Sequence, residues 1–380
     1  MNSHPPSSTL HPRRILVRGV NWLGDAVMTT PALLRLREKF PDAHIALLTP
    51  EKLADLWVNH PAVDGTIPFA SGENLFGVAK KLEPANFDLA LVLPNSPRSA
   101  LEVFLARIPQ RIGYARPWRN FFLTQTVASR PEAVKMHKRS AAEINHLVAA
   151  DVNRQQTPVS RVLTNTATGA HQIHEYLHLV AALGANPAPL APHLFVTPEE
   201  VEATRKKFGL EGISGPVFGL NPGAEYGPAK RWPVERFIAA AQQIQSKTNC
   251  LWLLFGGKND EATTTQIQPA TGNRQSAINL AGQTTLRELM ALLKLCRVVL
   301  TNDTGPMHVA AALGTPVVPL FGSTSPELTG PGLPGDPRHH LLKSNAVCSP
   351  CFLRECPIDF RCMKGIEVER VVEAVLAAWS

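Results

Sequence analysis

The stretch VVLTNDTGPMHVAAALGTPVVPLFG, residues 298–322, decides the fold. Its first three residues are apolar and β-branched or Leu, which is typical of a buried parallel strand. The chain then enters a helix that ends at Gly314, and a Thr-Pro pair opens the next strand. The stretch therefore predicts a β-α-β unit whose helix start offers unpaired N–H groups and a positive dipole end. A phosphate would bind there, although an ordinary β-α-β unit capped by Asp303 has the same pattern.

The same alternation of apolar strands and helices runs through both halves of the chain. Apolar runs at 13–18, 44–50 and 87–94 in the first half, and at 216–220 and 250–255 in the second, are each followed by a helical pattern. Alternation of this kind indicates doubly wound parallel sheets. The sequence therefore predicts an α/β protein with two Rossmann-like domains that face each other across a cleft. Ligands are expected at the carboxyl ends of the strands.

Composition shifts suggest where the domains begin and end. The chain is expected to have four parts: a loose N-terminal tail (1–12), an acceptor-side domain (13–190), a donor-binding domain (191–365) and a C-terminal helix (366–380) that packs back on the first domain. Residues 135–170 are rich in Ser, Thr, Asn and Gln and are predicted to form a mobile insertion in the first domain. The prolines between 185 and 192 predict a hinge.

Composition and charge exclude several classes of protein. The chain has 380 residues, of which 44% are hydrophobic and 18% charged, which is typical of a globular protein and not of a disordered one. No apolar run approaches the roughly 20 residues of a transmembrane helix, and the tail lacks a signal core, so a cytoplasmic location is expected. The basic clusters are short and not interleaved with aromatic residues, which disfavours nucleic acid. The net charge of +7 suits anionic small molecules or an anionic membrane surface.

A glycine-bracketed turn follows the first apolar strand and carries a candidate base. The spacing from Gly19 to Gly24 invites comparison with a P-loop, but Asp25 and Ala26 stand where the P-loop has Lys and Ser or Thr. Hydrolysis of ATP or GTP by this loop is therefore not expected. Gly24 would let a ligand approach the backbone, and Asp25 could take a proton from a hydroxyl group or simply cap the helix.

Four further candidate residues lie in the second half. In the turn NPGAEYGPAKRWP (221–233), crowding by glycine and proline favours anion binding by Lys230 and Arg231, with exposed surface cations as the alternative. Glu261 follows a Gly-Gly turn and could accept hydrogen bonds from ribose hydroxyls, or be an exposed first-turn carboxylate. His308 lies near the start of the phosphate-site helix, or is a core histidine bonded to backbone.

Four cysteines near the C-terminus form the pattern C-x2-C-x4-C-x5-C: Cys348, Cys351, Cys356 and Cys362. In a reducing compartment such a cluster favours zinc, or less often an iron–sulfur cluster, over disulfides. A structural metal site is therefore one hypothesis, and four reduced, unligated thiols are the other. No G-x-G-x-x-G opens either half, so hydride transfer has no signature here, and neither H-E-x-x-H nor G-x-S-x-G occurs.

Four segments together resemble a known family: VNWLGDAVMTTPAL (20–33), VLPNSPRSAL (92–101), NPGAEYGPAKRWP (221–233) and TNDTGPMHVAAALGTPVV (301–318). They are similar to the ADP-heptose:lipopolysaccharide heptosyltransferases of glycosyltransferase family 9, and most of all to the type II members of that family. The resemblance extends over residues 14–328. The segment 135–170, the cysteine cluster and the tail depart from it.

The resemblance implies a GT-B fold and an inverting transfer that needs no metal or other cofactor. It implies ADP-L-glycero-D-manno-heptose as the donor and the lipid-linked heptosyl-Kdo inner core as the acceptor, with peripheral contact at the cytoplasmic face of the inner membrane. Asp25 is implied as the general base and Lys230 as the pyrophosphate-binding lysine. The other implied binding residues are Gly24, Asn221, Gly223, Glu261, Asp303, Thr304, Gly305 and His308.

Two alternatives to this interpretation remain open at this point. One is another GT-B transferase that uses a different nucleotide sugar. The other is a nucleotide-sugar-binding protein that has lost turnover, and the presence of both Asp25 and Lys230 argues against it.

Overall fold

The structure is a computed structural model that describes residues 11–134, 136–152, 161–163, 169–270 and 276–380. The expected tail lies almost wholly outside these ranges, and so does much of the segment 135–170. The chain divides into two compact units. Unit 1 contains the residues up to Ala133 together with Gln172–Leu190, and unit 2 contains Val134–His171 and Ala191–Ser380.

Unit 1 is built on a six-stranded sheet in the order β3-β2-β1-β4-β5-β6, and every neighbouring pair is parallel. Its strands are β1 (Arg14–Arg18), β2 (His44–Pro50), β3 (Gly65–Phe69), β4 (Leu89–Val92), β5 (Gln110–Tyr114) and β6 (Gln125–Val127). Its helices are α1 (Leu23–Lys39), α2 (Leu75–Leu82), α3 (Pro97–Leu105) and α5 (Ile173–Ala181), with the 3-10 turns η1 (Glu51–Trp57), η2 (Glu83–Ala85) and η3 (Asn120–Phe122).

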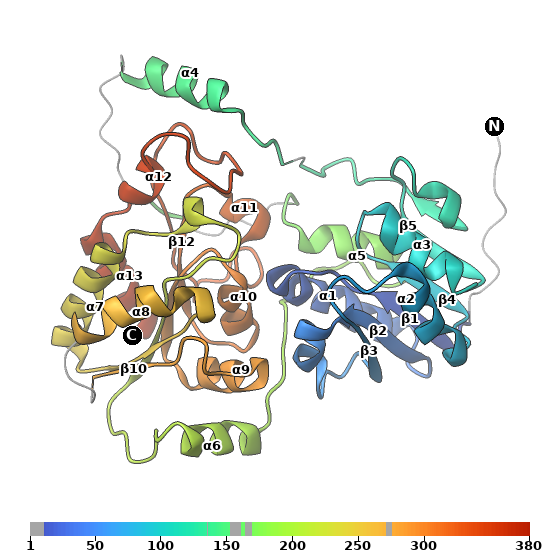
Figure 1. Ribbon diagram of the computed structural model, residues 1–380, viewed down its shortest axis with the longest axis horizontal. Coiled ribbons are helices and arrows are strands. Elements are labelled where there is room, and N and C mark those ends of the chain that lie inside the picture. The colour runs from blue at the N-terminus through green and yellow to red at the C-terminus, as the bar shows by residue number, and fades with distance from the viewer. Residues whose placement is uncertain (1–10, 135, 153–160, 164–168, 271–275) are drawn as a thin grey trace. The chain divides into compact units, whose positions relative to one another are not determined.

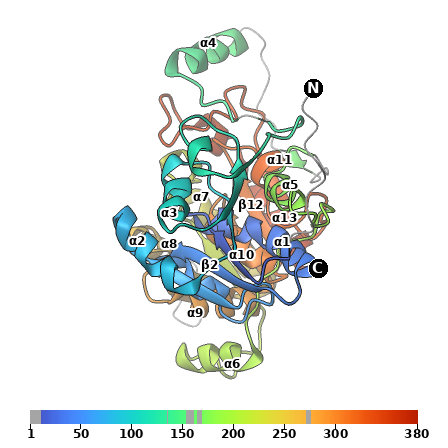
Figure 2. The same cartoon turned by 90° about the vertical axis from the view of Figure 1, so that its right-hand side faces the viewer.

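Helices cover both faces of this sheet. The helices α2 and α3 pack together on one face, and α1 and α5 pack together on the other (Figures 1 and 2). Both faces of β1 are therefore covered, which explains why Ile15, Leu16 and Val17 are all fully buried. The predicted doubly wound arrangement is confirmed for unit 1.

Unit 2 has a seven-stranded sheet in the order β10-β9-β8-β11-β12-β13-β7, parallel except for the antiparallel edge pair β13–β7. Its strands are β7 (Arg161–Leu163), β8 (Val217–Asn221), β9 (Leu251–Leu254), β10 (Ala277–Asn279), β11 (Val298–Asn302), β12 (Val317–Phe321) and β13 (Leu341–Lys343). Its helices are α4 (Ala141–Val152), α6 (Pro198–Lys207), α7 (Val234–Thr248), α8 (Glu261–Ala270), α9 (Leu286–Leu295), α10 (Gly305–Ala312), α11 (Pro326–Thr329), α12 (Arg361–Lys364) and α13 (Val368–Trp379), with the 3-10 turns η4 (Pro228–Lys230) and η5 (Lys258–Asp260).

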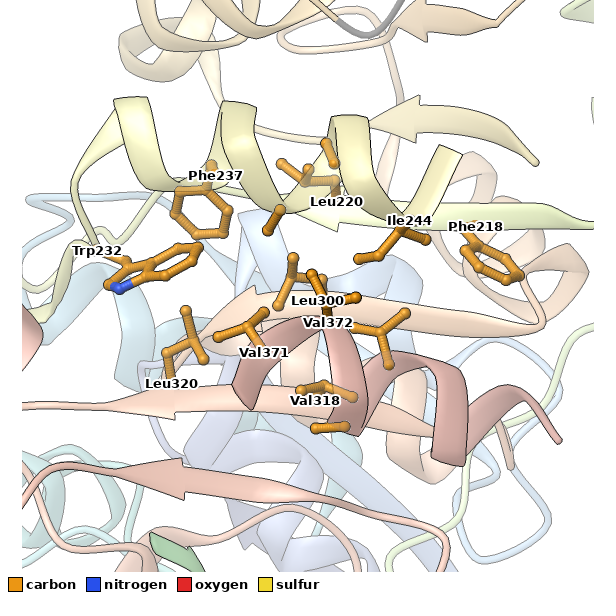
Figure 3. Close-up of a cluster of buried hydrophobic side chains, with 14 of the residues drawn as sticks. Phe218, Leu220, Trp232, Phe237, Ile244, Leu300, Val318, Leu320, Val371 and Val372 are labelled. Atoms are coloured by element: carbon orange, nitrogen blue, oxygen red, sulfur yellow. The ribbon is translucent and has the colours of Figure 1, made fainter. Parts of the chain in front are cut away.

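The C-terminal helix α13 belongs to unit 2, so the prediction that it packs back on the first domain is wrong. Its apolar side chains Val371, Val372 and Val375 are buried in one cluster with residues of α7, β8, β11 and β12. Figure 3 shows Val371 and Val372 facing Leu300 and the side chains of α7. The apolar stripe of α13 is therefore already used within its own unit.

The described parts of the segment 135–170 also belong to unit 2, and not to the first domain as predicted. Its helix α4 buries Ile144 in a small apolar cluster with Cys348 and Cys351, and its strand β7 pairs with β13 at the sheet edge. Both contacts join residues about 200 positions apart, so composition alone could not reveal them. Among the described residues, no helix is both long and apolar enough to cross a bilayer.

Candidate functional site

The carboxyl edge of the unit 2 sheet brings a lysine and an aspartate into contact. The strands β8 and β11 are parallel neighbours, so the turn after β8 and the turn after β11 lie at the same edge. Lys230, at the end of η4, places its Nζ atom 2.6 Å from Oδ2 of Asp303, and 13% and 4% of the two side chains are exposed. The lysine is therefore not a surface cation, which was the alternative interpretation of this turn.

Asp303 does not cap α10, which removes the alternative of an ordinary capped β-α-β unit. The N-cap residue is Thr304, whose side chain makes no capping hydrogen bond. The Asp303 carboxylate instead accepts hydrogen bonds from Lys230 and from the hydroxyl of Thr324, 2.5 Å away. Thr304 and Gly305 are only partly buried, so the helix start can receive an anion beside the lysine.

The predicted binding residues Asn221 and Gly223 set the conformation of the turn that leads to Lys230. The Asn221 amide is buried and donates to Oγ1 of Thr301 on the neighbouring strand, 3.2 Å away. A Cβ atom on Gly223 would lie 2.3 Å from Oδ2 of Asp260, so a side chain there would have to displace the Asp260 carboxylate. Both residues therefore fix the path of the backbone that leads to Lys230.

Glu261, the residue predicted to bind the ribose hydroxyls, lies next to Asp260, a carboxylate with more hydrogen-bond partners. Glu261 is exposed and opens α8, which matches the alternative of an exposed first-turn carboxylate. The preceding residue, Asp260, accepts hydrogen bonds from Nη2 of Arg231 at 3.2 Å and from the backbone N–H of Gly257 at 3.0 Å. Arg231 is thus paired, and Asp260 lies closer than Glu261 to the Gly223 turn.

His308 is buried in the first turns of α10 and is neutral at pH 7. Burial lowers the pKa of its imidazole to about 4, and His171 and Lys230 lower it further while Asp303 opposes them. The structure gives its ring no hydrogen bond to any described residue, in contrast to the predicted alternative of a core histidine bonded to backbone. A neutral ring nitrogen in this position could donate to or accept from a bound ligand.

The backbone around Cys351 contacts the turns beside Asp303 and Lys230, which the sequence did not suggest. The backbone N–H groups of Cys351 and Phe352 both donate to the carbonyl of Ser323, next to Thr324. Two residues later, the Arg354 carbonyl accepts from the N–H of Ala229, beside Lys230, at 3.0 Å. This part of the backbone therefore connects the two turns that hold Asp303.

The predicted metal site is not formed. Among the described residues, no group of three or more His, Cys, Asp and Glu side chains is placed to hold a metal ion. All the cysteines of the chain are free thiols. Burial raises the pKa of Cys348 and Cys351, which pack against Ile144, and raises that of Cys362 to about 12. Protonated thiols in apolar surroundings are poor metal ligands.

In unit 1, the candidate base lies in the first turn of α1. The helix begins at Leu23 rather than at the predicted Ala26, and its N-cap is Trp22, so Asp25 is not the N-cap residue. Its Oδ1 accepts a hydrogen bond from Nε2 of Gln172 at 3.1 Å, and the same amide donates to the hydroxyl of Tyr176 at 2.9 Å. Burial, followed by the negative charge of Asp25, holds the pKa of Tyr176 well above its usual range, so it is a neutral phenol.

A buried ion pair fixes the turn that carries Gly24 and Asp25. Arg18, the last residue of β1, places Nε 2.8 Å from Oε2 of Glu102 on α3, and both side chains are almost fully buried. The same guanidinium donates to the carbonyl of Gly19 and to Oδ1 of Asn21. The path from β1 to α1 is therefore set by residues 84 positions apart.

Comparisons with known proteins identify the family of the chain. The family model described as "Glycosyltransferase family 9 (heptosyltransferase)" matches residues 153–360. The chain is 31% identical over 330 residues to lipooligosaccharide heptosyltransferase 2 of Haemophilus influenzae, covering 83% of this chain and 85% of that protein. It is 32% identical over 333 residues to lipopolysaccharide heptosyltransferase 2 of Escherichia coli, covering 84% and 85%.

The solved structures give the same result for the whole fold. The structure of E. coli ADP-heptose lps heptosyltransferase II superposes with a TM-score of 0.73 and 28% identity, covering 96% of this chain and 98% of that one. Two Rossmann-like units of this kind make up the GT-B fold, so the predicted fold class is confirmed. On the family model and the identity to these relatives, the chain belongs to glycosyltransferase family 9, the heptosyltransferases.

Proposed function

We propose that the protein transfers L-glycero-D-manno-heptose from ADP-heptose to the lipid-linked heptosyl-Kdo inner core of lipopolysaccharide, with inversion at the anomeric carbon. The observation that carries the proposal is the placement of Lys230, Asp303 and the start of α10 at one edge of the unit 2 sheet, in a member of this family. We further propose that the protein works at the cytoplasmic face of the inner membrane, where such an acceptor is made.

The donor half of the mechanism follows from charge. When the sugar leaves, negative charge develops on the β-phosphate of ADP. The Lys230 ammonium and the first N–H groups of α10, near Thr304 and Gly305, are fixed donors for that charge. Asp303 orients the ammonium through their ion pair, and Thr324 orients Asp303. We assign Lys230 to the pyrophosphate, and Asp303 to the positioning of Lys230.

The acceptor half follows from proton transfer. Inversion is a single in-line displacement, so one carboxylate is enough to take the proton of the attacking hydroxyl. We assign that role to Asp25, which Gln172 orients through a neutral hydrogen bond. A hydrogen bond from a neutral amide orients a carboxylate and lowers its basicity less than a hydrogen bond from a cation does.

The experiment is incubation of the purified protein with ADP-heptose and a truncated inner-core acceptor, with product detected by mass spectrometry. Transfer supports the proposal. Transfer that occurs only with another nucleotide sugar would indicate a different GT-B donor specificity. Binding of ADP-heptose without product would indicate a protein that has lost turnover, and either of these results would overturn the proposal.

A further inference from the structure

Two large aromatic side chains are exposed on the loop between β5 and β6. In this loop, residues 115–124, Trp118 is 89% exposed and Phe121 is 93% exposed. Burying such a side chain stabilises a protein by about 1.5–3 kcal/mol, so two that remain in water within four residues suggest a binding surface. Trp118 also has a φ of 64°, which a residue with a bulky side chain rarely adopts.

The remainder of the loop is firmly anchored. Arg119 is completely buried and donates through Nη1 to the carbonyl of Pro94, 2.8 Å away. Oδ1 of Asn120 accepts from the backbone N–H of Arg116 at 2.9 Å. The ring of Phe122 packs on Phe104, with centroids 5.4 Å apart. Trp118 and Phe121 are therefore held outward by a loop that Arg119, Asn120 and Phe122 anchor.

The sequence around the loop is basic, although Arg119 is buried and Arg130 is paired with Glu175. From 103 to 131 the sequence contains no Asp or Glu and five arginines, at positions 107, 111, 116, 119 and 130. Arg107 is exposed, and Arg111 stacks on Phe104 at 5.4 Å from the ring centroid. Exposed aromatic side chains next to arginines are typical of surfaces that bind the interface of an anionic bilayer. Each arginine near such a surface contributes about 1 kcal/mol.

The position of the loop connects it with the candidate base. The loop starts after Tyr114, at the carboxyl end of β5, and Asp25 follows the carboxyl end of β1. Since β1, β4 and β5 are parallel neighbours, Asp25 and the first residues of the loop lie at the same edge of the unit 1 sheet. The loop then crosses toward the opposite edge, where β6 begins parallel to β5. The hydrogen bond from Arg119 to the Pro94 carbonyl, just after β4, keeps Trp118 near the edge that carries Asp25. We infer that the 115–124 loop inserts Trp118 and Phe121 into the headgroup region of an anionic lipid bilayer. A lipid-linked acceptor would thereby be presented to the edge that carries Asp25, and this last step rests on the proposed function.

Vesicle binding tests the inference. The full-length protein is mixed with phosphatidylcholine vesicles that contain or lack phosphatidylglycerol, and the bound fraction is measured by co-sedimentation. Binding is expected only to the anionic vesicles, and added salt should weaken it because surface charges are screened. The double variant Trp118→Ser/Phe121→Ser should lose about tenfold or more of its partitioning. The conservative variant Trp118→Phe/Phe121→Leu should retain most of it.

Two controls make the test specific. Phe76→Ser removes another exposed phenylalanine, 74% exposed on α2, and should leave vesicle binding unchanged. An equal loss in this variant, or no binding of the unmodified protein to anionic vesicles, would overturn the inference. In transfer assays, the double variant should lose activity toward an acceptor embedded in vesicles and keep it toward an acyl-free oligosaccharide. Loss toward both would place the two side chains in the sugar site instead.

The outcome is separable from the proposed function. If the unmodified protein binds anionic vesicles and transfers no heptose to either acceptor, the lipid contact stands and the heptosyl transfer fails. If it transfers heptose to both acceptors and binds no vesicles, the transfer stands and the lipid contact fails.

Discussion

The two candidate half-sites differ in how their charged group is held. In unit 1, the Asp25 carboxylate accepts from the neutral amide of Gln172. In unit 2, the Lys230 ammonium forms a mostly buried ion pair with Asp303, whose carboxylate also accepts from Thr324. A base must keep its affinity for a proton, whereas a phosphate-binding cation must be oriented before charge develops on the leaving group. The difference in partners therefore matches the difference in proposed task.

The substitution with the largest expected effect is Asp25→Asn, which keeps the shape of the side chain and removes the proposed base. We expect kcat to fall on the order of 10³-fold or more, because no other group is assigned to the proton. Binding of ADP-heptose, measured by calorimetry, should be nearly unchanged. The exposed aspartate in Asp42→Asn provides a matched control that should keep full activity. A near-normal kcat for Asp25→Asn would remove the base assignment.

Removal of the cation is the next largest effect. Lys230→Ala should raise the barrier by about 2–4 kcal/mol, the cost of losing one preorganised electrostatic donor. Asp303→Asn keeps the Lys230 ammonium but weakens the interaction that orients it. The kcat of this variant should therefore fall less, by about tenfold. Both are measured by steady-state kinetics with Lys247→Ala, an exposed lysine on α7, as the control. A larger loss in Asp303→Asn than in Lys230→Ala would show that Asp303 is not merely a positioning residue.

The buried histidine of unit 2 predicts an acid-sensitive stability. The folded pKa of His308 is about 4 and the ordinary value is 6.5, so the unfolded chain binds the extra proton between these values. Stability is therefore complete above pH 6.5 and falls as the pH drops toward 4. Between about pH 8 and about pH 5, unfolding free energy should fall by about 2 kcal/mol from this residue.

Urea unfolding of the unmodified protein and of His308→Gln at both pH values measures this term. The variant should lose stability at pH 8 through altered packing, but its further loss at pH 5 should be smaller than that of the unmodified protein. His339, with a folded pKa also near 4, supplies the acid sensitivity that remains. Equal pH dependence of the two proteins would mean that His308 is not buried as a neutral group.

The folds of both units were accessible from the sequence because their strands are apolar on both faces. The apolar sequences of β1, β2, β8 and β11 are typical of buried parallel strands and predicted these strands from the sequence alone. The short strands β6, β7 and β13 were missed, since each has three residues and no sustained apolar run. The apolar stripe of α13 predicted that the helix is buried. The stripe alone does not show which of the two hydrophobic cores the helix packs against.

The site was predictable in its charged residues and not in their partners. Asp25, Lys230 and Asp303 each follow a buried strand, where ligands of parallel sheets bind, so position and chemistry together made them candidates. Gln172, Thr324 and the Arg354 carbonyl reach the site from segments remote in sequence, and none carries a local signal. The cysteine pattern predicted a metal because spacing alone does not show that Cys348 and Cys351 face an apolar cluster.

The smallest expected effect concerns the partner of the base. Gln172→Ala removes the donor to Asp25 and leaves its charge, so kcat should fall by about 3–10-fold, the worth of one hydrogen bond. The KM for ADP-heptose should stay the same, because the proposed donor contacts lie in unit 2. A purely structural role in unit 1 would instead lower the unfolding temperature and leave kcat per folded molecule unchanged.

Gln172→Glu turns the same position into a test of the electrostatic argument. A second carboxylate beside Asp25 disfavours its charged form, so the pKa of Asp25 should rise and the acidic limb of the kcat profile should move to higher pH. Above that limb the variant should approach normal activity, since a more basic carboxylate remains in place. If the limb does not move, Asp25 is not the group whose ionisation limits turnover, and the contrast between a neutrally held base and an ion-paired cation loses its functional meaning.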